Sequence, residues 1–176
     1  NIVSGVADYR IVSGNDAGYF AIDSSGQITL TAAGAAAAAN DFEALPNSFT
    51  LDVEAGDAAG NWSTAEVVVI SVTDVNDVAP EITTATTHSV DENTAFSVAL
   101  ASSDIDTVGT NPATFSITGG DDAALFSIDG SGNLVLGAQD FESPADVGTA
   151  PGDNVYEVVV TANDGANPTT KTISVT

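Results

Sequence analysis

The sequence has very few basic residues and lacks two residue types altogether. Its 176 residues include 25 Asp or Glu, only 2 Lys or Arg, 1 His, and no Cys or Met, so the formal net charge at pH 7 is -23. Without cysteine, neither a disulfide nor a thiolate metal site can form. Because two basic side chains cannot neutralise phosphates, nucleic acids and anionic membrane surfaces are excluded as partners.

Long apolar runs are missing as well. No stretch approaches the ~20 apolar residues of a membrane helix, so membrane insertion is not expected. Hydrophobic residues nevertheless make up 43% of the chain, which is enough to build a core. Chemistry led by histidine, cysteine or lysine would depend on His88 and Lys171 alone. Paired carboxylates also hydrolyse glycosides, but no apolar pocket accompanies them in the sequence, and we predict that the chain is not an enzyme.

An internal repeat organises what is present. The stretch Tyr9–Leu30 matches Phe115–Leu136 in register, and Asp41-Phe42-Glu43 recurs as Asp140-Phe141-Glu142. Changes in spacing between the copies indicate loop insertions, at Ala32–Asn40 in the first and Ser143–Gly152 in the second. The sequence therefore predicts two homologous units of about a hundred residues each.

The repeated units have the pattern of β-strands. Apolar and polar residues alternate with period two in four segments, which are Ser48–Ala55, Thr94–Leu100, Val155–Ala162 and Lys171–Thr176. Short strands separated by Gly, Asn and Asp turns predict an all-β fold of tandem antiparallel Greek-key sandwiches of the immunoglobulin type. We expect the domains at residues 1–79 and 80–176. The first has no counterpart of Thr94–Leu100 and is expected to be N-terminally incomplete, either truncated or split.

The carboxylates fall into short sets near the expected strand ends. Alternate residues of an extended segment point the same way, so an Asp-x-Asp or Asp-x-Glu pair can place two carboxylates on one ion. Calcium takes six to eight oxygen ligands, and the ligands that zinc or copper prefer are scarce here. An EF-hand starting at Asp104 fails, because it would need a carboxylate where Phe115 stands.

At this point a resemblance becomes specific. The segment Asp74–Pro80 (DVNDVAP) resembles the D-x-N-D-x-x-P linker of cadherin repeats. Companion motifs follow in the family's order: Glu92-Asn93, Ala101 to Asp106 (A-x-x-D-x-D), Asn111, Asp140 to Glu142 (D-x-E), and Ala162 to Asp164 (A-x-D). The composition is similar to that of repeat regions in bacterial surface adhesins.

The resemblance implies a Ca2+ cluster at the junction between the two units. Its ligands would be Asp41, Glu43, Asp74, Asn76, Asp77, Asp104, Asp106, Asn111 and Asp164. Weaker half-sites of neighbouring junctions would involve Asp57, Glu92, Asp140 and Glu142. The family usually has Asn where Val78 stands, and the first unit has no counterpart of Glu92.

The remaining polar and aromatic residues have simpler interpretations. Asp121, Asp122 and Asp146 match no ligand position and are expected in surface turns, while Asp23 and Asp129 are expected in hairpin turns. Trp62, the single tryptophan, could form a platform for a sugar ring, although packing over a loop or a neighbouring domain is favoured.

Together these observations predict a calcium-stabilised extracellular module that acts as a rigid extender within a cell-surface adhesion protein. Its partners would be neighbouring repeats of the same chain. The alternative is a ligand-binding module that recognises a carbohydrate or peptide on a target surface and mediates calcium-dependent adhesion.

Overall fold

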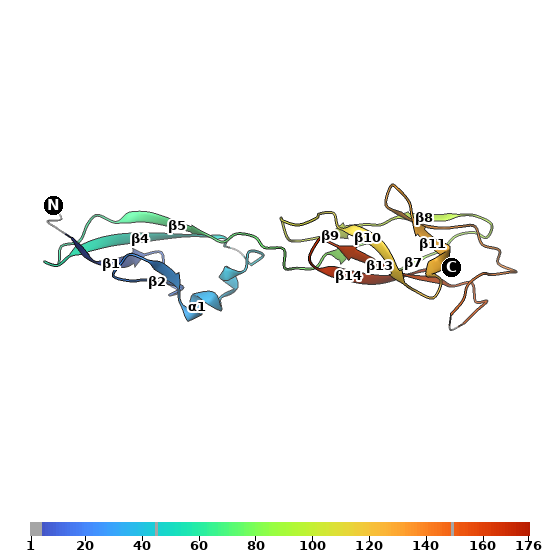
Figure 1. Cartoon of the computed structure of the whole chain (residues 1–176), viewed down its shortest axis with the longest axis horizontal. Helices are drawn as coiled ribbons and strands as arrows, with labels where there is room; N and C mark the ends of the chain where they lie inside the picture. The colour runs from blue at the N-terminus through green and yellow to red at the C-terminus, as the bar shows by residue number, and fades with distance from the viewer. Residues whose placement is uncertain (1–4, 45, 149) are drawn as a thin grey trace. The chain divides into compact units, whose positions relative to one another are not determined.

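The chain folds into two compact units, comprising Asn1–Asp74 and Val75–Thr176, in a computed structural model that describes residues 5–44, 46–148 and 150–176 (Figure 1). The linker residues Val75–Ala79 thus group with the second unit. The division expected at residues 79 and 80 lies slightly further along the chain, and the limits of the folding domains stay a prediction. No helix in the described ranges is long and apolar enough to cross a membrane.

The second unit is a β-sandwich. Its strands are β6 (Glu81–Ile82), β7 (Thr87–His88), β8 (Phe96–Ala99), β9 (Ser102–Ser103), β10 (Thr114–Gly119), β11 (Phe126–Ile128), β12 (Asn133–Leu136), β13 (Tyr156–Asn163) and β14 (Pro168–Val175). One sheet has the order β10-β13-β14-β7 and another the order β11-β12-β8, while β6 pairs with β9. All pairs are antiparallel except β14 with β7. The predicted all-β class is confirmed.

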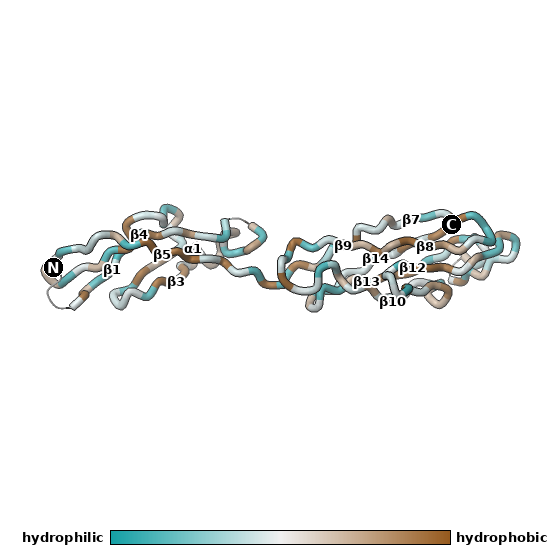
Figure 2. Tube along the Cα trace, turned by 90° about the horizontal axis from the view of Figure 1, so that it is seen from above, coloured by the Kyte–Doolittle hydropathy of each residue, from teal (hydrophilic) through white to brown (hydrophobic). Residues whose placement is uncertain are grey.

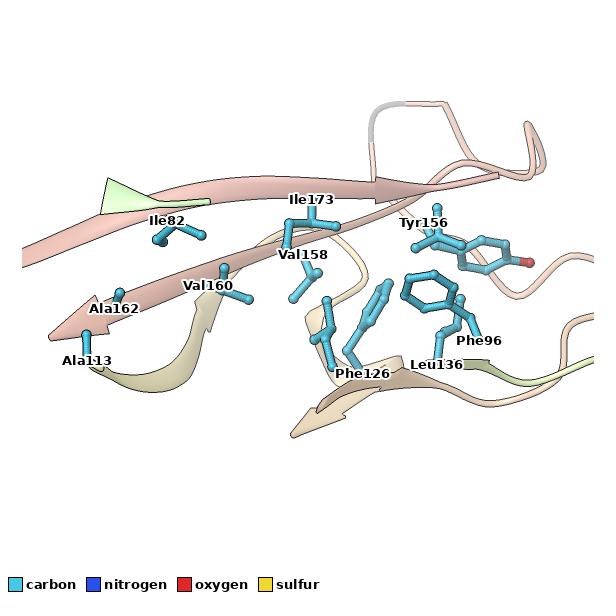
Figure 3. Close-up of a cluster of buried hydrophobic side chains, with 12 residues drawn as sticks. Ile82, Phe96, Ala113, Phe126, Leu136, Tyr156, Val158, Val160, Ala162 and Ile173 are labelled. Atoms are coloured by element: carbon cyan, nitrogen blue, oxygen red, sulfur yellow. The ribbon is translucent and has the colours of Figure 1, made fainter. Parts of the chain in front are cut away.

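The core of this unit follows from the period-two alternation. Along β13, Tyr156, Val158, Val160 and Ala162 are buried, and the residues between them are less so. Figure 3 shows aromatic rings gathered at one end of the core and small side chains such as Ala162 at the other. Strand β13 finishes at the end of the core that holds the small side chains, and the loop that follows it begins with Asp164.

The opening segment of the second unit is fastened by the only lysine of the chain. Lys171 Nζ donates hydrogen bonds to the carbonyl oxygens of Ile82 (2.8 Å) and Thr84 (2.7 Å). Thr84 Oγ1 in turn accepts a bond from Ala101 N at 2.8 Å. The ammonium group therefore connects β14 to the chain just after β6.

The described residues of the first unit form fewer strands. They are β1 (Val6–Ser13), β2 (Phe20–Ile22), β3 (Ile28–Leu30), β4 (Ser48–Asp57) and β5 (Glu66–Ser71). One sheet has the order β1-β4-β5, and β2 pairs with β3. The alanine-rich insertion forms the short helix α1 (Ala32–Ala35), capped by Thr31 Oγ1, and the 3-10 turn η1 (Ala38–Asn40).

Strand pairing in the two units agrees where both can be compared. Phe20 lies opposite Leu30 in the first unit, as Phe126 lies opposite Leu136 in the second. In β5, by contrast with β13, residues 67–70 are all apolar (Figure 2).

Three hairpin loops share one aspartate-centred turn, at Asp23, Asp57 and Asp129. In each loop the Asp Oδ1 accepts hydrogen bonds from the backbone N–H groups two and four residues later. The turns expected at Asp23 and Asp129 are confirmed. For Asp129, the side-chain bond from Asn133 and the backbone bonds around it hold the carboxyl pKa below its ordinary value.

The lowered pKa predicts how Asp129 acts on stability. A carboxylate whose folded pKa lies below its unfolded value of about 3.9 stabilises the fold above that pH, and the contribution is lost as pH falls through the folded pKa. In urea unfolding, Asp129→Ala should therefore have a lower free energy of unfolding than the unsubstituted protein at pH 6, and this difference should shrink at pH 3. Asp16→Ala, at an exposed loop residue, is the control, and a deficit of the same size at both pH values would contradict the prediction.

The buried core predicts a large cost for truncating Leu134, which is fully buried. Replacing a buried leucine with alanine removes transfer free energy and leaves a cavity, so Leu134→Ala should lower the free energy of unfolding by about 3 kcal/mol. Val147→Ala, at a side chain that is 56% exposed, should change it by less than about 0.5 kcal/mol. Equal losses in denaturant unfolding would argue against the packing described.

Candidate metal centre

Three aspartates of the second unit form a compact acidic cluster, which we call the upper cluster: Asp104, Asp106 and Asp164. Asp104 and Asp106 lie in the loop after β9, and Asp164 follows β13. Each contributes a carboxylate oxygen, and these oxygens lie within 4.8 Å of one another. Asp106 is 2% and Asp164 is 1% exposed, so two of the charges are held out of water.

Backbone groups hold Asp106 in place through one oxygen only. Its Oδ2 accepts a hydrogen bond from Val78 N at 3.0 Å, and its own N–H donates to Asp104 Oδ1 at 3.2 Å. Within the described part of the chain, the buried Oδ1 of Asp106 has no hydrogen-bond partner. A buried carboxylate oxygen without a donor is costly, so it requires a ligand of opposite charge or a water.

Asp164 is held by the turn that follows it. Its Oδ1 accepts bonds from Ala166 N and Asn167 N, each at 2.7 Å. Burial by itself would raise the pKa of this carboxyl group, but the hydrogen bonds from Asn167 and Ala166 outweigh burial and lower the pKa. Asp164 is therefore kept ionised despite lying in the interior.

Asn76 brings an amide to the same cluster. One atom of its amide head lies 3.1 Å from Asp106 Oδ2 and 2.8 Å from Asp164 Oδ2. If that atom is nitrogen, it donates to both carboxylates. If it is oxygen, it accepts a hydrogen bond from Asn167 Nδ2 at 3.2 Å and faces the two carboxylate oxygens, an arrangement that a cation would stabilise. Asn167 Nδ2 fixes the Asn76 backbone by donating to its carbonyl oxygen at 3.1 Å.

A glycine makes this approach of Asn76 feasible. Gly109 has φ +90, and a Cβ atom there would lie 2.2 Å from Asn76 Nδ2 and 3.2 Å from the Asp164 carbonyl oxygen. The neighbouring Thr110 N donates to that same carbonyl at 2.6 Å. The loop between β9 and β10 thus closes over the upper cluster by backbone contact.

A second acidic set, the lower cluster, consists of Glu92, Asp140 and Glu142. Their carboxylate oxygens also lie within 4.8 Å of one another, but all three residues are exposed. Phe141 N donates to Glu92 Oε2 at 3.4 Å, and Glu142 N donates to Asp140 Oδ1 at 3.0 Å. The negative charge of Glu92 raises the pKa of Glu142, as expected where like charges crowd together.

The other predicted ligands are placed as follows. In the second unit, Asp77 and Asn111 are exposed, at the start of the unit and in the β9–β10 loop. In the first unit, Glu43 N donates to Asp41 Oδ1 at 3.1 Å, the same turn as in Asp140–Glu142. Asp74 is half-buried after β5. The ligand roles of these residues stay predictions.

The side chain of Asp57, a predicted half-site ligand, stabilises a hairpin turn in the structure. Both of its carboxylate oxygens accept hydrogen bonds from Asn61 Nδ2, at 3.2 and 2.9 Å, within the hairpin turn between β4 and β5. The side-chain bond from Asn61 leads the contributions that lower its pKa. Its predicted part in a metal half-site remains a prediction.

The expectation that Asp122 and Asp146 lie in surface turns is wrong. They are 1% and 5% exposed, and both accept hydrogen bonds from backbone N–H groups of the insertion, at Val147 and Gly152. Asp122 accepts from Val147 N (2.6 Å) and Glu157 N (2.8 Å), and Asp146 Oδ2 accepts from Gly152 N (2.7 Å). Asp121 alone is exposed, as expected. The sequence carries no local signal for this burial, because it depends on the path of the insertion.

Trp62 packs over its own hairpin rather than standing free. The Arg10 guanidinium carbon lies 4.0 Å from the ring centroid, and Arg10 also forms an ion pair with Glu54 at 2.6 Å. The ring contacts the face of Gly56, where a Cβ atom would lie 3.0 Å from it. One face of the indole is thus covered by a cation–π contact.

Solved cadherin structures are similar to the chain in fold. The alignment with Drosophila N-cadherin EC1-4 has 24% identity and a TM-score of 0.63, and covers 96% of this chain and 39% of that one. Human protocadherin-24 EC1-2 gives 23% identity, a TM-score of 0.61, and coverage of 96% and 81%. Mouse protocadherin-24 EC1-3 has 18% identity to the chain and a TM-score of 0.56. The alignment covers 100% of this chain and 56% of the mouse one.

The likeness establishes a cadherin-like β-sandwich fold. The chain spans well under half of the Drosophila structure that it matches. No model of a protein family matches the sequence, and no curated protein does either.

The close approach at Gly109 can be tested with a matched glycine. Gly109→Ala adds left-handed strain of about 1–2 kcal/mol and also pushes against Asn76. Gly132 has φ +83 with open space around it, so Gly132→Ala carries the strain alone. In chelator, Gly109→Ala should lower the free energy of unfolding more than Gly132→Ala does. Equal losses would show that the loop does not need to approach Asn76.

Proposed function

We propose that the chain is a non-catalytic module of a cell-surface adhesion protein, in which Ca2+ binds at the upper cluster and stiffens the junction between the two units. The observation that carries this proposal is the buried Oδ1 of Asp106, which lacks a partner in the described part of the chain. It belongs to a cluster of three aspartate carboxylates in the second unit.

The chemistry of the donor set favours a hard cation. The cluster offers carboxylates from Asp104, Asp106 and Asp164, and no thiol or imidazole accompanies them among the described residues. Calcium binds such oxygens at 2.3–2.6 Å and takes six to eight of them, whereas zinc and copper prefer nitrogen and sulfur. Neighbouring oxygens around one calcium ion lie about 3 Å apart.

The Asn76 amide fits this interpretation. The distances of 3.1 and 2.8 Å from one amide atom to Asp106 Oδ2 and Asp164 Oδ2 suit oxygens that share one ion. They equally suit two hydrogen bonds from nitrogen when no ion is bound. We therefore propose that Asn76 rotates its amide on calcium binding, with Oδ1 as a ligand in the bound form and Nδ2 as a donor in the free form.

The resemblance to cadherin repeats supplies the remaining ligands of the proposed site. They would be the carboxylates of Asp41, Glu43, Asp74 and Asp77 and the carbonyl oxygen of Asn111. Seven carboxylates gathered at one junction repel by about 3 kcal/mol per pair at ~5 Å and an effective dielectric near 20. Without a cation this repulsion would separate the units, and with calcium it becomes attraction to a shared ion.

The lower cluster is proposed as half of the equivalent site at the next junction. Glu92, Asp140 and Glu142 are exposed, which suits ligands that await a partner domain. The raised pKa of Glu142 indicates that the charges are crowded before any cation arrives. The partners of the module would then be neighbouring repeats of the same protein, and its location the outside of the cell.

The composition suggests that this protein is a bacterial surface adhesin. Small secreted domains commonly use disulfides for stability, whereas this chain has no cysteine and 25 acidic residues. Metal binding would replace covalent cross-links as the source of stiffness.

Calcium titration tests the proposal. Adding Ca2+ to chelator-treated protein should raise Tm, and saturation at 100 times Kd corresponds to about 2.7 kcal/mol of added stability. X-ray scattering should show a narrower range of end-to-end distances with calcium than with chelator. Unchanged melting and unchanged scattering in the two conditions would contradict the proposal.

Two carboxamide variants make the test specific to the upper cluster. Asp106→Asn removes a ligand and should abolish most of the calcium-dependent rise in Tm. Asp146→Asn removes an equally buried carboxylate outside the cluster and should leave that rise intact. Loss of the rise in both variants would mean that the response reflects net charge and not this site.

A further inference from the structure

Asn167 contacts the upper cluster without being one of its expected ligands. It lies in the turn between β13 and β14, just after Asp164. Its backbone N–H donates to Asp164 Oδ1 at 2.7 Å, and its side-chain Nδ2 lies 3.1 Å from the Asn76 carbonyl oxygen and 3.2 Å from Asn76 Oδ1. One half-buried amide thus contacts both the backbone and the side chain of a proposed calcium ligand.

The backbone contact fixes which way the Asn167 amide points. A carboxamide has an acceptor oxygen on one side and a donor nitrogen on the other, so turning it around reverses every hydrogen bond that it makes. A turned Asn167 would place its Oδ1 where Nδ2 now lies, 3.1 Å from the Asn76 carbonyl oxygen. Two acceptor oxygens would then face each other with no proton between them. The donor side of Asn167 is therefore directed at Asn76.

With Asn167 fixed, its neighbours favour one orientation of the Asn76 amide. The Nδ2 of Asn167 carries two N–H groups, one for the Asn76 carbonyl and one for the Asn76 side chain. When Asn76 Oδ1 faces it, that oxygen accepts at 3.2 Å, and Asn76 Nδ2 donates to the Asp164 carbonyl oxygen at 3.4 Å. The turned amide would bring nitrogen against nitrogen at 3.2 Å and oxygen against the Asp164 carbonyl oxygen. Both contacts favour Oδ1 on the side of the carboxylates.

The carboxylates favour the opposite orientation when no ion is bound. The same head atom of Asn76 lies 3.1 Å from Asp106 Oδ2 and 2.8 Å from Asp164 Oδ2, so a nitrogen there would donate to both. Asn167 therefore opposes the rotation of Asn76 that we propose for the calcium-free form. A bound cation removes the conflict, because carboxylates and Asn76 Oδ1 then share it. Asn167 thus disfavours the free form relative to the bound form.

We propose that Asn167 is a positioning residue for calcium at the upper cluster: it holds the Asn76 amide with Oδ1 toward the carboxylates and so raises the affinity for the ion. The proposal rests on the calcium site of the proposed function and concerns how tightly that site binds. Asn167 acts through Asn76. One net hydrogen bond changes an equilibrium constant by about fivefold, and the effect on Kd should be of that size.

A double-mutant cycle with Asn76→Asp tests the proposal. Asn167→Leu keeps the approximate shape of the side chain and removes the donor, so the calcium Kd should rise about fivefold in calorimetry on the whole chain. The transition that belongs to the upper cluster is the one that Asp106→Asn removes. In Asn76→Asp both head atoms are oxygen and orientation no longer matters, so Asn167→Leu should change Kd there by less than about twofold. Equal losses in the two backgrounds would overturn the proposal.

The matched control is Asn133→Leu. Asn133 Nδ2 donates to Asp129 Oδ2 at 2.8 Å in a hairpin turn outside both acidic clusters. Removing this amide costs a comparable hydrogen bond but should leave the calcium Kd unchanged. A rise in Kd as large as that of Asn167→Leu would overturn the proposal, because lost stability alone would then weaken calcium binding.

A second measurement needs no calcium. In chelator, Asn167→Leu removes the donor that competes with the carboxylates, so the Asn76 side-chain NH2 group should exchange with water more slowly than in the unsubstituted chain, by about twofold or more. NMR of the side-chain amides measures this exchange, and an unchanged or faster rate would overturn the proposal. If Asp106→Asn removes no calcium transition, the calcium site itself fails, whereas slower exchange in chelator would still support the orienting role of Asn167.

Discussion

The structure depends on how negative charges are held without basic partners. With 25 carboxylates and 2 basic side chains, ion pairing can satisfy very few of them. Backbone N–H groups take that role instead: Asp129 closes a hairpin, Asp122 joins an insertion loop to β13, and Asp164 fixes the turn after that strand. For Asp129 and Asp164 these bonds lower the pKa, so the fold favours the ionised form of both carboxyl groups. Asp106 and Asp146 are exceptions, because each has a buried Oδ1 without a donor among the described residues, and of the two only Asp106 lies within an acidic cluster.

This constraint explains why the two acidic clusters differ. The upper cluster is buried and fixed by the Asn76 and Gly109 contacts, so its charges are pre-organised within one unit. The lower cluster is exposed, and crowding raises the pKa of Glu142 instead of being relieved by backbone donors. A preformed site pays less to bind an ion than a site that must first be ordered. The calcium site proposed at the upper cluster would therefore bind the ion more tightly than the one proposed at the lower cluster.

Much of the fold and part of the candidate metal site could be predicted from the sequence, because strand alternation and D-x-D spacing are local signals. Alternation located β4, β8, β13 and β14, and the spacing of Asp104 and Asp106 indicated a pair that the structure brings to Asp164. The burial of Asp122 and Asp146 was not predictable, because it depends on the path of an insertion with no repeat counterpart. The hairpin role of Asp57 was missed for a different reason. Its A-x-D motif matches that of Asp164, yet the following residues build a different turn.

The same scarcity of basic residues has a consequence for survival outside a cell. Proteases that cut after lysine or arginine find only two cleavage positions in the chain, at Arg10 and Lys171. Both lie inside strands, β1 and β14, and both side chains are bonded, to Glu54 and to the carbonyls of Ile82 and Thr84. A strand must leave its sheet before a protease can bind it, so cleavage requires local unfolding first. Trypsin-like enzymes would therefore digest this chain slowly while it stays folded.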